Sequence, residues 1–438
     1  MGGLSTPWLA PGGDPPSEFD WRSKRIALLT YGTRGDVEPF VALAGRLRGA
    51  GADVVLAAPE SFRPLAAAHD LELFALPGNP QELARQFVEQ AGHSRFRMIR
   101  TMTGHVMGIA AEAFKRIGEA CRGASCIVHS FLMTSPGHLF ASRDRIPEIS
   151  AQLFPVFSST RSFSAPTFPD LPLGPGYRWL THALNSFIYW EGGRLLYARL
   201  RRRDRALPAY PSWPFGERGR VRLLYAYSPA VVAAPPDWGP ASLVTGYWFL
   251  DPPAAWAPPA PLVTFLESGP PPVYVGFGSM QSRRSAQIAR EAVRALLKAG
   301  LRGVVSVPDG VLDPDGLPAS LFRVGDVPHS WLFPRMAAVV HHGGAGTTGA
   351  ALRAGRPSLI IPLTADQAFW ARRVHRLGTS PPPLARARLT ADNLAEAIRA
   401  AVEDPSIEAS AREVGGRIAG EDGAGRAVEE IARVIATR

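Results

Sequence analysis

The chain has 438 residues, of which 46% are apolar and 20% charged, and its length exceeds what one hydrophobic core usually encloses, so we expect two domains. Its formal net charge is +10, but arginine replaces lysine throughout and no nucleic-acid motif accompanies the charge, which argues against nucleic-acid binding. Two cysteines, Cys121 and Cys126, are too few for a disulfide framework or a zinc site and favour a reducing, cytoplasmic location.

The N-terminal half predicts a doubly wound α/β domain. Residues 1–24 are rich in glycine and proline and lack the pattern of a signal peptide, so we expect a flexible leader there. A buried strand at 24–30, a helix at 37–49 and a second strand at 53–58 then form a βαβ unit. Strand patterns recur further on, and an aromatic-rich helical stretch at 177–200 interrupts the alternation. We place this domain at 25–235.

The C-terminal half repeats the alternation after a linker. Proline becomes dense around 236–262, which indicates an interdomain linker. Strand and helix patterns then alternate again over 263–420. A final helix is expected at 421–438, and packing back on the N-terminal domain is one arrangement that we consider for it. The pattern predicts two nucleotide-type halves on either side of a cleft.

The segment 339–370 has the pattern of a phosphate cradle. An apolar strand leads into His341-His342-Gly343-Gly344-Ala345-Gly346, and a helical pattern opens at Thr347. Free N–H groups at a helix start, without side chains in the way, bind anions. A second strand at 358–362 leads to Asp366 and Gln367, a carboxylate beside an amide that suits sugar hydroxyls. Together they predict a nucleotide-sugar site.

At these residues the chain resembles a known family. The motifs HHGGAGTT, ADQ and FWxxRVHRLG follow one another as in the donor-binding signature of the family 1 glycosyltransferases, which they resemble. The nearest resemblance is to the sterol 3-beta-glucosyltransferase branch, and bacterial antibiotic transferases share most of the pattern. The segments 32–40, 245–251 and 275–280 also resemble family motifs and occur in the same order along the chain. The resemblance covers nearly the whole chain beyond residue 24. It implies the GT-B fold, two Rossmann-like doubly wound α/β domains facing across a cleft, with the acceptor mainly on the N-terminal half and the donor on the C-terminal half.

The resemblance also implies the donor contacts. His342 and Thr347 match the residues that meet the diphosphate, Asp366 and Gln367 the pair that holds the sugar, and Val327 with His329 the stretch that binds the base. The full expected donor-binding set is Gly278, Ser279, Val327, His329, His342, Gly344, Gly346, Thr347, Asp366 and Gln367. Plant-type relatives have a glutamate for the donor ribose where this chain has Ala350, which leaves UDP and dTDP both open.

We expect no metal cofactor. A hydrogen-bonding or positive imidazole together with helix-start amides can replace a metal ion at a leaving diphosphate. Asp313 and Asp315 have the Asp-x-Asp spacing that chelates manganese in the other major transferase fold, but they lie in a proline and glycine turn and do not end a strand. We therefore interpret them as a surface turn. His341 faces away from His342 if the strand continues, and we assign it to packing.

Inverting transfer needs a base for the acceptor hydroxyl, and Asp36 is our candidate. It follows the first strand, where ligands gather in open α/β sheets. Its place equally fits a helix N-cap; the loop position alone favours neither interpretation, and the family resemblance favours catalysis. An aspartate with its usual pKa of about 3.9 is a weak base unless burial raises that value. His129 and His138 stay open as residues that assist it.

The function that we predict is transfer of glucose from UDP-glucose to a hydroxyl of a sterol-like, apolar acceptor. Aromatic residues between 154 and 190 would line the acceptor pocket, although core packing explains most of them. The alternative is transfer from a UDP- or dTDP-sugar to an antibiotic aglycone or a lipid. A more distant alternative is a non-catalytic partner protein with the same fold. A nicotinamide-dependent enzyme is disfavoured because the first turn lacks Gly-x-Gly-x-x-Gly.

Two basic clusters mix arginine with apolar residues, at 95–100 and at 199–205. This mixture suits a membrane interface, but a solvated helix face is the interpretation that we favour. Peripheral contact of a cytoplasmic protein with a membrane therefore stays an alternative.

Overall fold

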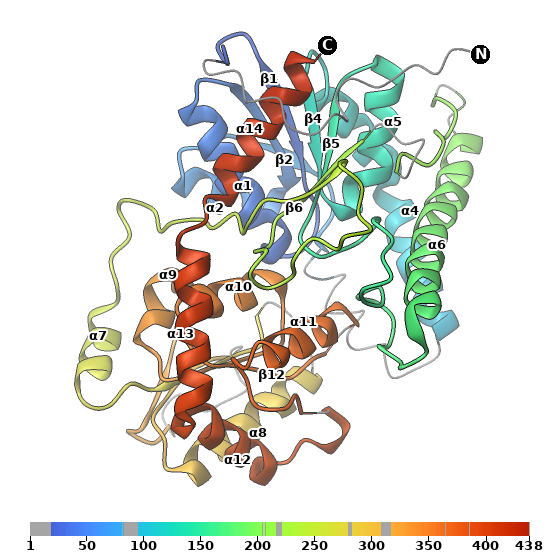
Figure 1. Ribbon diagram of the computed structural model, residues 1–438. Helices are drawn as coiled ribbons and strands as arrows, with labels where there is room; N and C mark the ends of the chain where they lie inside the picture. Colours follow the sequence, from blue (N-terminus) through green and yellow to red (C-terminus); the bar gives the residue numbers. More distant parts are fainter. Residues whose placement is uncertain are drawn as a thin grey trace.

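The computed structural model describes residues 19–80, 82, 95–203, 205, 207–215, 221–278, 283–307, 317–363, 365–384 and 386–437. They form two parallel sheets with helices around each (Figure 1). The strand order β3-β2-β1-β4-β5-β6-β7 in the first sheet and β10-β9-β8-β11-β12 in the second is that of doubly wound domains. The predicted fold class is therefore confirmed.

The strands of the first sheet are β1 (Arg25–Leu29), β2 (Asp53–Pro59), β3 (Leu73–Leu76), β4 (Cys126–His129), β5 (Glu148–Gln152), β6 (Arg222–Tyr225) and β7 (Ser242–Val244). Those of the second are β8 (Val273–Gly276), β9 (Gly303–Ser306), β10 (Leu321–Arg323), β11 (Val339–His341) and β12 (Ser358–Ile360). The central strands are buried on both faces, which is why they read as continuous apolar runs in the sequence.

The helices of the N-terminal half are α1 (Arg34–Gly49), α2 (Arg63–Ala68), α4 (Arg95–Ala120), α5 (Thr134–Asp144) and α6 (Gly174–Arg203). The C-terminal half has α7 (Ala260–Glu267), α8 (Arg283–Ala299), α9 (His329–Leu332), α10 (Ala345–Arg353), α11 (Ala365–Arg376), α12 (Ala391–Glu403), α13 (Pro405–Ala419) and α14 (Gly423–Ala436). Within the described residues, no helix combines the length and the apolar character that crossing a membrane requires.

The segment that we expected to be linker is partly ordered. Residues 242–244 form β7, which pairs with β6 and extends the first sheet beyond the predicted boundary at 235. The prolines that suggested a linker lie in the loops on either side of β7, and a three-residue strand at a sheet edge tolerates such neighbours. Helix α7 begins at Ala260, inside the same predicted segment.

The last helix returns to the N-terminal domain. Helix α13 packs on α10 of the second domain and α14 packs on α1 of the first, so the two span the domain boundary (Figure 1). Ala427 and Ile431 of α14 are fully buried in the core around α1. Arg46 of α1 also forms an ion pair with Asp422, at 2.6 Å, at the start of α14.

Aromatic side chains fill the contact between the domains. Tyr227, which follows β6, packs edge-on against Trp370 of α11, with ring centroids 5.8 Å apart. Tyr247 lies against α10, where a Cβ on Gly349 would come within 2.6 Å of its ring. The Thr-Gly-Tyr-Trp segment therefore belongs to the domain interface, and glycine at 349 is what allows this close approach.

Candidate active site

The loop after β1 presents Asp36 at the first turn of α1. The N-cap of this helix is Thr33, and Asp36 is its third helical residue. One carboxylate oxygen, Oδ2, accepts hydrogen bonds from the backbone N–H of Thr33 at 2.8 Å and from its Oγ1 at 3.1 Å. Asp36 is thus the acidic residue of a capping box, whose side chain bonds back to the N-cap. The N-cap itself is Thr33, three residues earlier, so the interpretation of Asp36 as the N-cap is wrong.

Glycine at position 32 is required for this arrangement. Its φ is +148°, and a Cβ there would lie 2.3 Å from Asp36 Oδ2. The carboxyl group therefore folds back onto the bare backbone of the loop. This tight position fixes Asp36 before any substrate arrives.

The surroundings of Asp36 make it a better base than a usual aspartate. Burial, with a smaller contribution from the negative charge of Asp366, raises its pKa to about 6 against the opposing hydrogen bonds from Thr33. The residue is half-buried and not fully enclosed. A carboxylate that is accessible and has a pKa close to the working pH suits proton abstraction.

The cradle after β11 is held by a buried histidine. The N–H of Gly343 donates to His341 Nδ1 at 3.1 Å, so the proton of the ring lies on Nε2, which contacts Ser358 Oγ at 2.8 Å. Burial lowers the pKa of His341 far below its usual value, and the ring stays neutral. His341 thus fixes the turn, as the packing assignment predicted.

The next residue, His342, lies between two glycines. A Cβ on Gly278 would lie 2.9 Å from its Cε1, and one on Gly344 would lie 2.8 Å from its Nε2. Burial lowers the pKa of His342 to about 4, and its buried Nδ1 has no hydrogen-bond partner. The imidazole is neutral, so of the two options that we considered it offers a hydrogen bond rather than a positive charge.

Helix α10 begins directly after this turn. Gly344 is its N-cap, and the helix runs from Ala345 through Gly346 and Thr347. A Cβ on Gly346 would meet nothing within 4 Å, so this first turn is open to solvent. Amide groups at such an end attract anions. The structure thus brings His342, Gly278 and the start of α10 together, as expected for a diphosphate site.

The predicted sugar contacts lie at the start of α11. Asp366 stands in its first turn, and its charge reaches Asp36 in the other domain. The next residue, Gln367, is 4% exposed, and its Oε1 accepts the N–H of Leu363 at 2.7 Å. Gln367 therefore holds the loop between β12 and α11, and contact of either side chain with a sugar stays a prediction.

The predicted base-binding stretch forms an ion pair with the loop that carries Asp36. His329, at the start of α9, stacks on Phe333 with ring centroids 4.2 Å apart, and burial lowers its pKa to about 4, assisted by the positive charge of Arg34. Val327 is buried. Arg34, two residues before Asp36, donates to both carboxylate oxygens of Asp326 at 2.5 Å. The sequence analysis missed this pair, because its partners are 292 residues apart.

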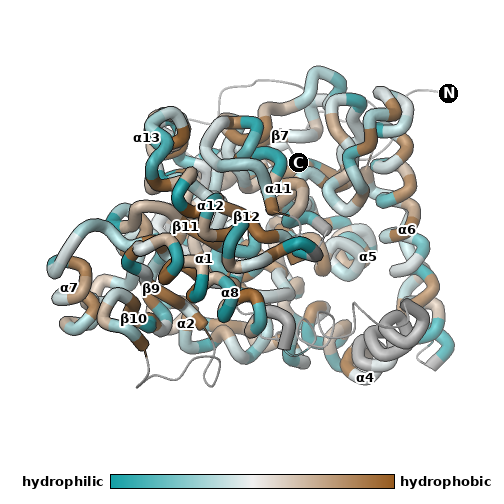
Figure 2. The backbone as a smooth tube through the Cα atoms, turned by 90° about the horizontal axis from the view of Figure 1, so that it is seen from below, coloured by the Kyte–Doolittle hydropathy of each residue, from teal (hydrophilic) through white to brown (hydrophobic). Residues whose placement is uncertain are grey.

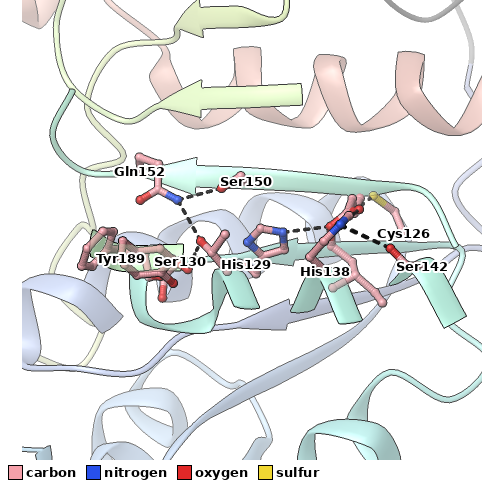
Figure 3. A network of polar contacts seen from close by, with 12 residues as sticks. Cys126, His129, Ser130, His138, Ser142, Ser150, Gln152 and Tyr189 are labelled. Atoms are coloured by element: carbon pink, nitrogen blue, oxygen red, sulfur yellow. Dashed lines mark hydrogen bonds and ion pairs between the residues drawn. The ribbon is translucent and has the colours of Figure 1, made fainter. Parts of the chain in front are cut away.

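His129 and His138 both contact Glu148. His129 Nε2 lies 3.2 Å from Glu148 Oε2, and His138 Nδ1 lies 2.6 Å from Glu148 Oε1, in a buried network between β4, β5 and α5 (Figure 3). Burial acts to raise the pKa of Glu148, but the hydrogen bonds and charges of the two histidines outweigh it and hold the pKa at about 2. Gly137 makes room for the ring of His129. These contacts favour a structural role for both histidines.

Some of the expected acceptor aromatics are core residues. Phe157 and Phe163 are buried, the first stacked on Phe215 with centroids 4.8 Å apart and the second packed on Phe369 of the C-terminal domain. Phe187, by contrast, is 64% exposed. Core packing, the alternative weighed from the sequence, therefore explains part of this group.

Four predictions fall wholly or largely outside the described residues. They are the flexible leader at 1–24, of which residues 1–18 are not described, the donor contact of Ser279, the surface turn with Asp313 and Asp315, and the side chains of the basic cluster 95–100. Where the structure does describe side chains, it holds no group of three or more His, Cys, Asp or Glu arranged to hold a metal ion. Cys121 and Cys126 are both buried thiols.

Comparison with known proteins places both halves in sugar transferases. Residues 26–130 match the family described as glycosyltransferase family 28 N-terminal domain, and residues 287–435 match the erythromycin biosynthesis protein CIII-like C-terminal domain. The chain is 38% identical over 411 residues to an O-mycaminosyltylonolide 6-deoxyallosyltransferase of Streptomyces fradiae, covering 91% of this chain and 94% of that one. It is 32% identical over 422 residues to a sterol 3-beta-glucosyltransferase of Arabidopsis thaliana, covering 93% of this chain and 68% of that one.

Solved structures with the same fold are more distant in sequence. The calicheamicin glycosyltransferase CalG4 has a TM-score of 0.68 at 17% identity and covers 95% of this chain and 99% of its own. The Streptomyces sp. SF2575 glycosyltransferase SsfS6, complexed with thymidine diphosphate, has a TM-score of 0.62 at 19% identity and covers 95% and 100%. At these identities the likeness shows the fold alone.

Proposed function

This chain belongs to the family 1 glycosyltransferases of GT-B fold, and we propose that it is an inverting enzyme that transfers a hexose from a nucleoside-diphosphate sugar to a hydroxyl of an apolar acceptor. One observation carries the proposal: the half-buried Asp36 carboxyl, with its pKa raised to about 6, feels the charge of Asp366 across the domain boundary. This electrostatic contact supports a site in which the base and the donor-binding motif act together.

Asp36 acts as the general base in this mechanism. It takes the proton of the acceptor hydroxyl while that oxygen forms a bond to the anomeric carbon on the face opposite the phosphate. The bond from the anomeric carbon to the phosphate oxygen breaks, and the nucleoside diphosphate leaves with the electron pair. A single displacement of this kind inverts the anomeric centre. A positioned base contributes about 10²–10⁴-fold to the rate.

The leaving diphosphate is stabilised by neutral hydrogen-bond donors. His342 offers its ring N–H, and the amides at the start of α10 add the partial positive charge of a helix end. Because these groups need no reorganisation when charge develops, we propose that turnover is independent of a divalent metal. Loss of turnover in EDTA and its recovery with manganese would contradict this part of the mechanism.

For the substrates we propose UDP-glucose and a sterol-like acceptor. The sterol 3-beta-glucosyltransferase among the relatives supports this choice. A second candidate is a deoxysugar on a macrolide, supported by the deoxyallosyltransferase of Streptomyces fradiae, which is 38% identical over 91% of this chain. Ala350, in place of the glutamate of plant-type relatives, leaves both UDP- and dTDP-sugars as donors to test.

Release of the nucleotide distinguishes these candidates. UDP-glucose and dTDP-glucose are offered in parallel with cholesterol, a plant sterol, a macrolide and a flavonoid. Sterol-dependent release of UDP supports the first candidate, and macrolide-dependent release supports the second. If no acceptor gives release with either donor while the protein still binds nucleotide, the non-catalytic alternative replaces the proposal.

A further inference from the structure

Helix α6 carries a stripe of exposed apolar side chains. Ten large apolar side chains are exposed among the described residues, and eight of them lie between Leu171 and Leu195, so they form a cluster rather than a scatter. The stripe on the helix consists of Leu180 (56% exposed), Leu184 (42%), Phe187 (64%), Ile188 (57%) and Leu195 (63%). Spacings of three, four and seven residues place these side chains on one face, over a length of about 22 Å.

The opposite face of α6 is the one that packs on the N-terminal domain. His182, Trp190, Tyr197 and Leu200 are all buried there. The hydroxyl of Tyr189 donates to the carbonyl of Phe131 at 2.6 Å and so holds the helix to the end of β4. Helix α6 lies on the outer side of the N-terminal domain (Figures 1 and 2). One of its apolar faces packs on the domain, and the other is exposed.

The charges around the stripe are almost all positive. Arg199 and Arg202 are exposed just beyond its C-terminal end. Glu191 is the one acidic residue in the sequence of α6, and it forms an ion pair with Arg194 at 2.6 Å. Trp179, at the N-terminal end, is 48% exposed. Apolar side chains next to arginines, with a tryptophan at the edge, complement lipid tails beneath anionic head groups.

We propose that the α6 stripe docks this protein on an anionic membrane surface. The arginines would interact with the head groups, while Phe187, Ile188 and their neighbours enter the outer part of the bilayer. A protein partner would need acidic groups placed next to an apolar groove, whereas an anionic bilayer offers both over its whole surface. The contact is peripheral, since the stripe covers one side of a helix whose other side is core.

The segment before α6 reaches the boundary between the two domains. Asp170, ten residues before Leu180, forms an ion pair with Arg376 at the C-terminal end of α11, at 2.8 Å. Docking through α6 would therefore bring the side of the molecule next to the domain boundary toward the lipid surface. This inference goes beyond the proposed transfer, because membrane binding requires neither donor nor turnover.

The test is co-sedimentation of the full-length protein with vesicles, in the absence of any nucleotide sugar. Vesicles of phosphatidylcholine mixed with phosphatidylserine are compared with vesicles of phosphatidylcholine alone. Phe187→Ser with Ile188→Ser removes the centre of the stripe, and Leu297→Ser is its matched control, since Leu297 is 44% exposed on α8. We expect the double variant to lose binding to the mixed vesicles by at least about tenfold, and the control to bind as the unmodified protein does.

A charge variant tests the second half of the proposal. Arg199→Gln with Arg202→Gln should lower binding to the mixed vesicles by about tenfold and leave binding to neutral vesicles unchanged. Arg386→Gln with Arg388→Gln, on the exposed 3-10 turn Arg386–Arg388, is its control. All four variants replace exposed side chains, and the thermal unfolding of each is measured alongside to show that it is folded.

Three results would overturn the proposal. The first is equal vesicle binding by the Phe187→Ser, Ile188→Ser protein and the unmodified one. The second is an equal loss in the control variants, which would make the contact nonspecific. The third is a dimer, detected by light scattering, that dissociates on substitution of Phe187 and Ile188 while vesicle binding is absent; this would assign the stripe to a second copy of the chain.

Discussion

Replacing Asp36 with asparagine should stabilise the protein at neutral pH. The pKa of Asp36 is raised from 3.8 to about 6 because the carboxyl is buried. A carboxyl group with a raised pKa contributes most to stability at a pH below its pKa in the unfolded protein. This contribution is lost as the pH rises through the pKa of the group in the folded protein. Above about pH 7 the folded protein therefore bears the full cost of the ionised group, and Asp36→Asn removes it.

The size of the effect follows from the shift. A shift of about two pKa units corresponds to about 1.4–4 kcal/mol, allowing an error of one unit. At about 2–4 °C per kcal/mol for a domain of 150–250 residues, such a gain raises the midpoint of thermal unfolding by about 3–16 °C. The difference between variant and unmodified protein should fall by roughly half when the pH is lowered to about 5, where much of the folded protein already carries the proton.

The assay is thermal unfolding of both proteins at about pH 7.5 and about pH 5, with Asp251→Asn, at an exposed position, as the control. Asparagine keeps an oxygen that can accept the N–H of Thr33, so the capping bond is retained. If Asp36→Asn lowers the midpoint at both values, the carboxylate is a helix-capping group that stabilises the fold, and the argument from burial is refuted.

Three further outcomes are expected. The rate of transfer should fall tenfold per unit below about pH 6, because protonation of Asp36 removes the base; a flat acid side of the profile would contradict this. His342→Ala should weaken nucleoside-diphosphate binding as well as turnover. In the unmodified protein, binding of the diphosphate should raise the pKa of the His342 imidazole in an NMR titration. An unchanged affinity of the His342→Ala variant for the diphosphate would show that His342 does not contact it. Arg34→Gln and Asp326→Asn should each reduce nucleotide affinity modestly. In a double-mutant cycle we expect a coupling energy of at most about 1 kcal/mol, because both side chains are partly exposed. Strictly additive effects would mean that the ion pair has no role in holding the two loops together.

The fold could be predicted from the sequence, and a candidate donor site could be proposed, because the signals for both are local. Continuous apolar strands alternating with helices predict a doubly wound sheet, and the glycines around His342 are close together in the chain. The structure adds the reason for them: Gly278 and Gly344 make room for the ring of His342 from two sides. Gly278 lies in the turn after β8, far from His342 along the chain, so this contact is not visible in the sequence.

The features that were missed depend on contacts between distant segments. The pKa of Asp36 depends on burial and on Asp366 of the other domain, neither of which its neighbours in sequence reveal. The pairing of His129 and His138 with Glu148 removed them as candidates only once β4, β5 and α5 were side by side (Figure 3). The linker was drawn too long because proline density marks loops and does not exclude a short edge strand between them.

The most direct test of Asp36 as the base compares turnover with nucleotide affinity in Asp36→Asn, using the donor and acceptor that give nucleotide release. The account predicts that kcat falls by about 10²-fold or more, while the dissociation constant of the nucleoside diphosphate, measured by calorimetry, stays close to that of the unmodified protein. Turnover that persists near the unmodified rate, with the same affinity, would contradict the assignment of Asp36.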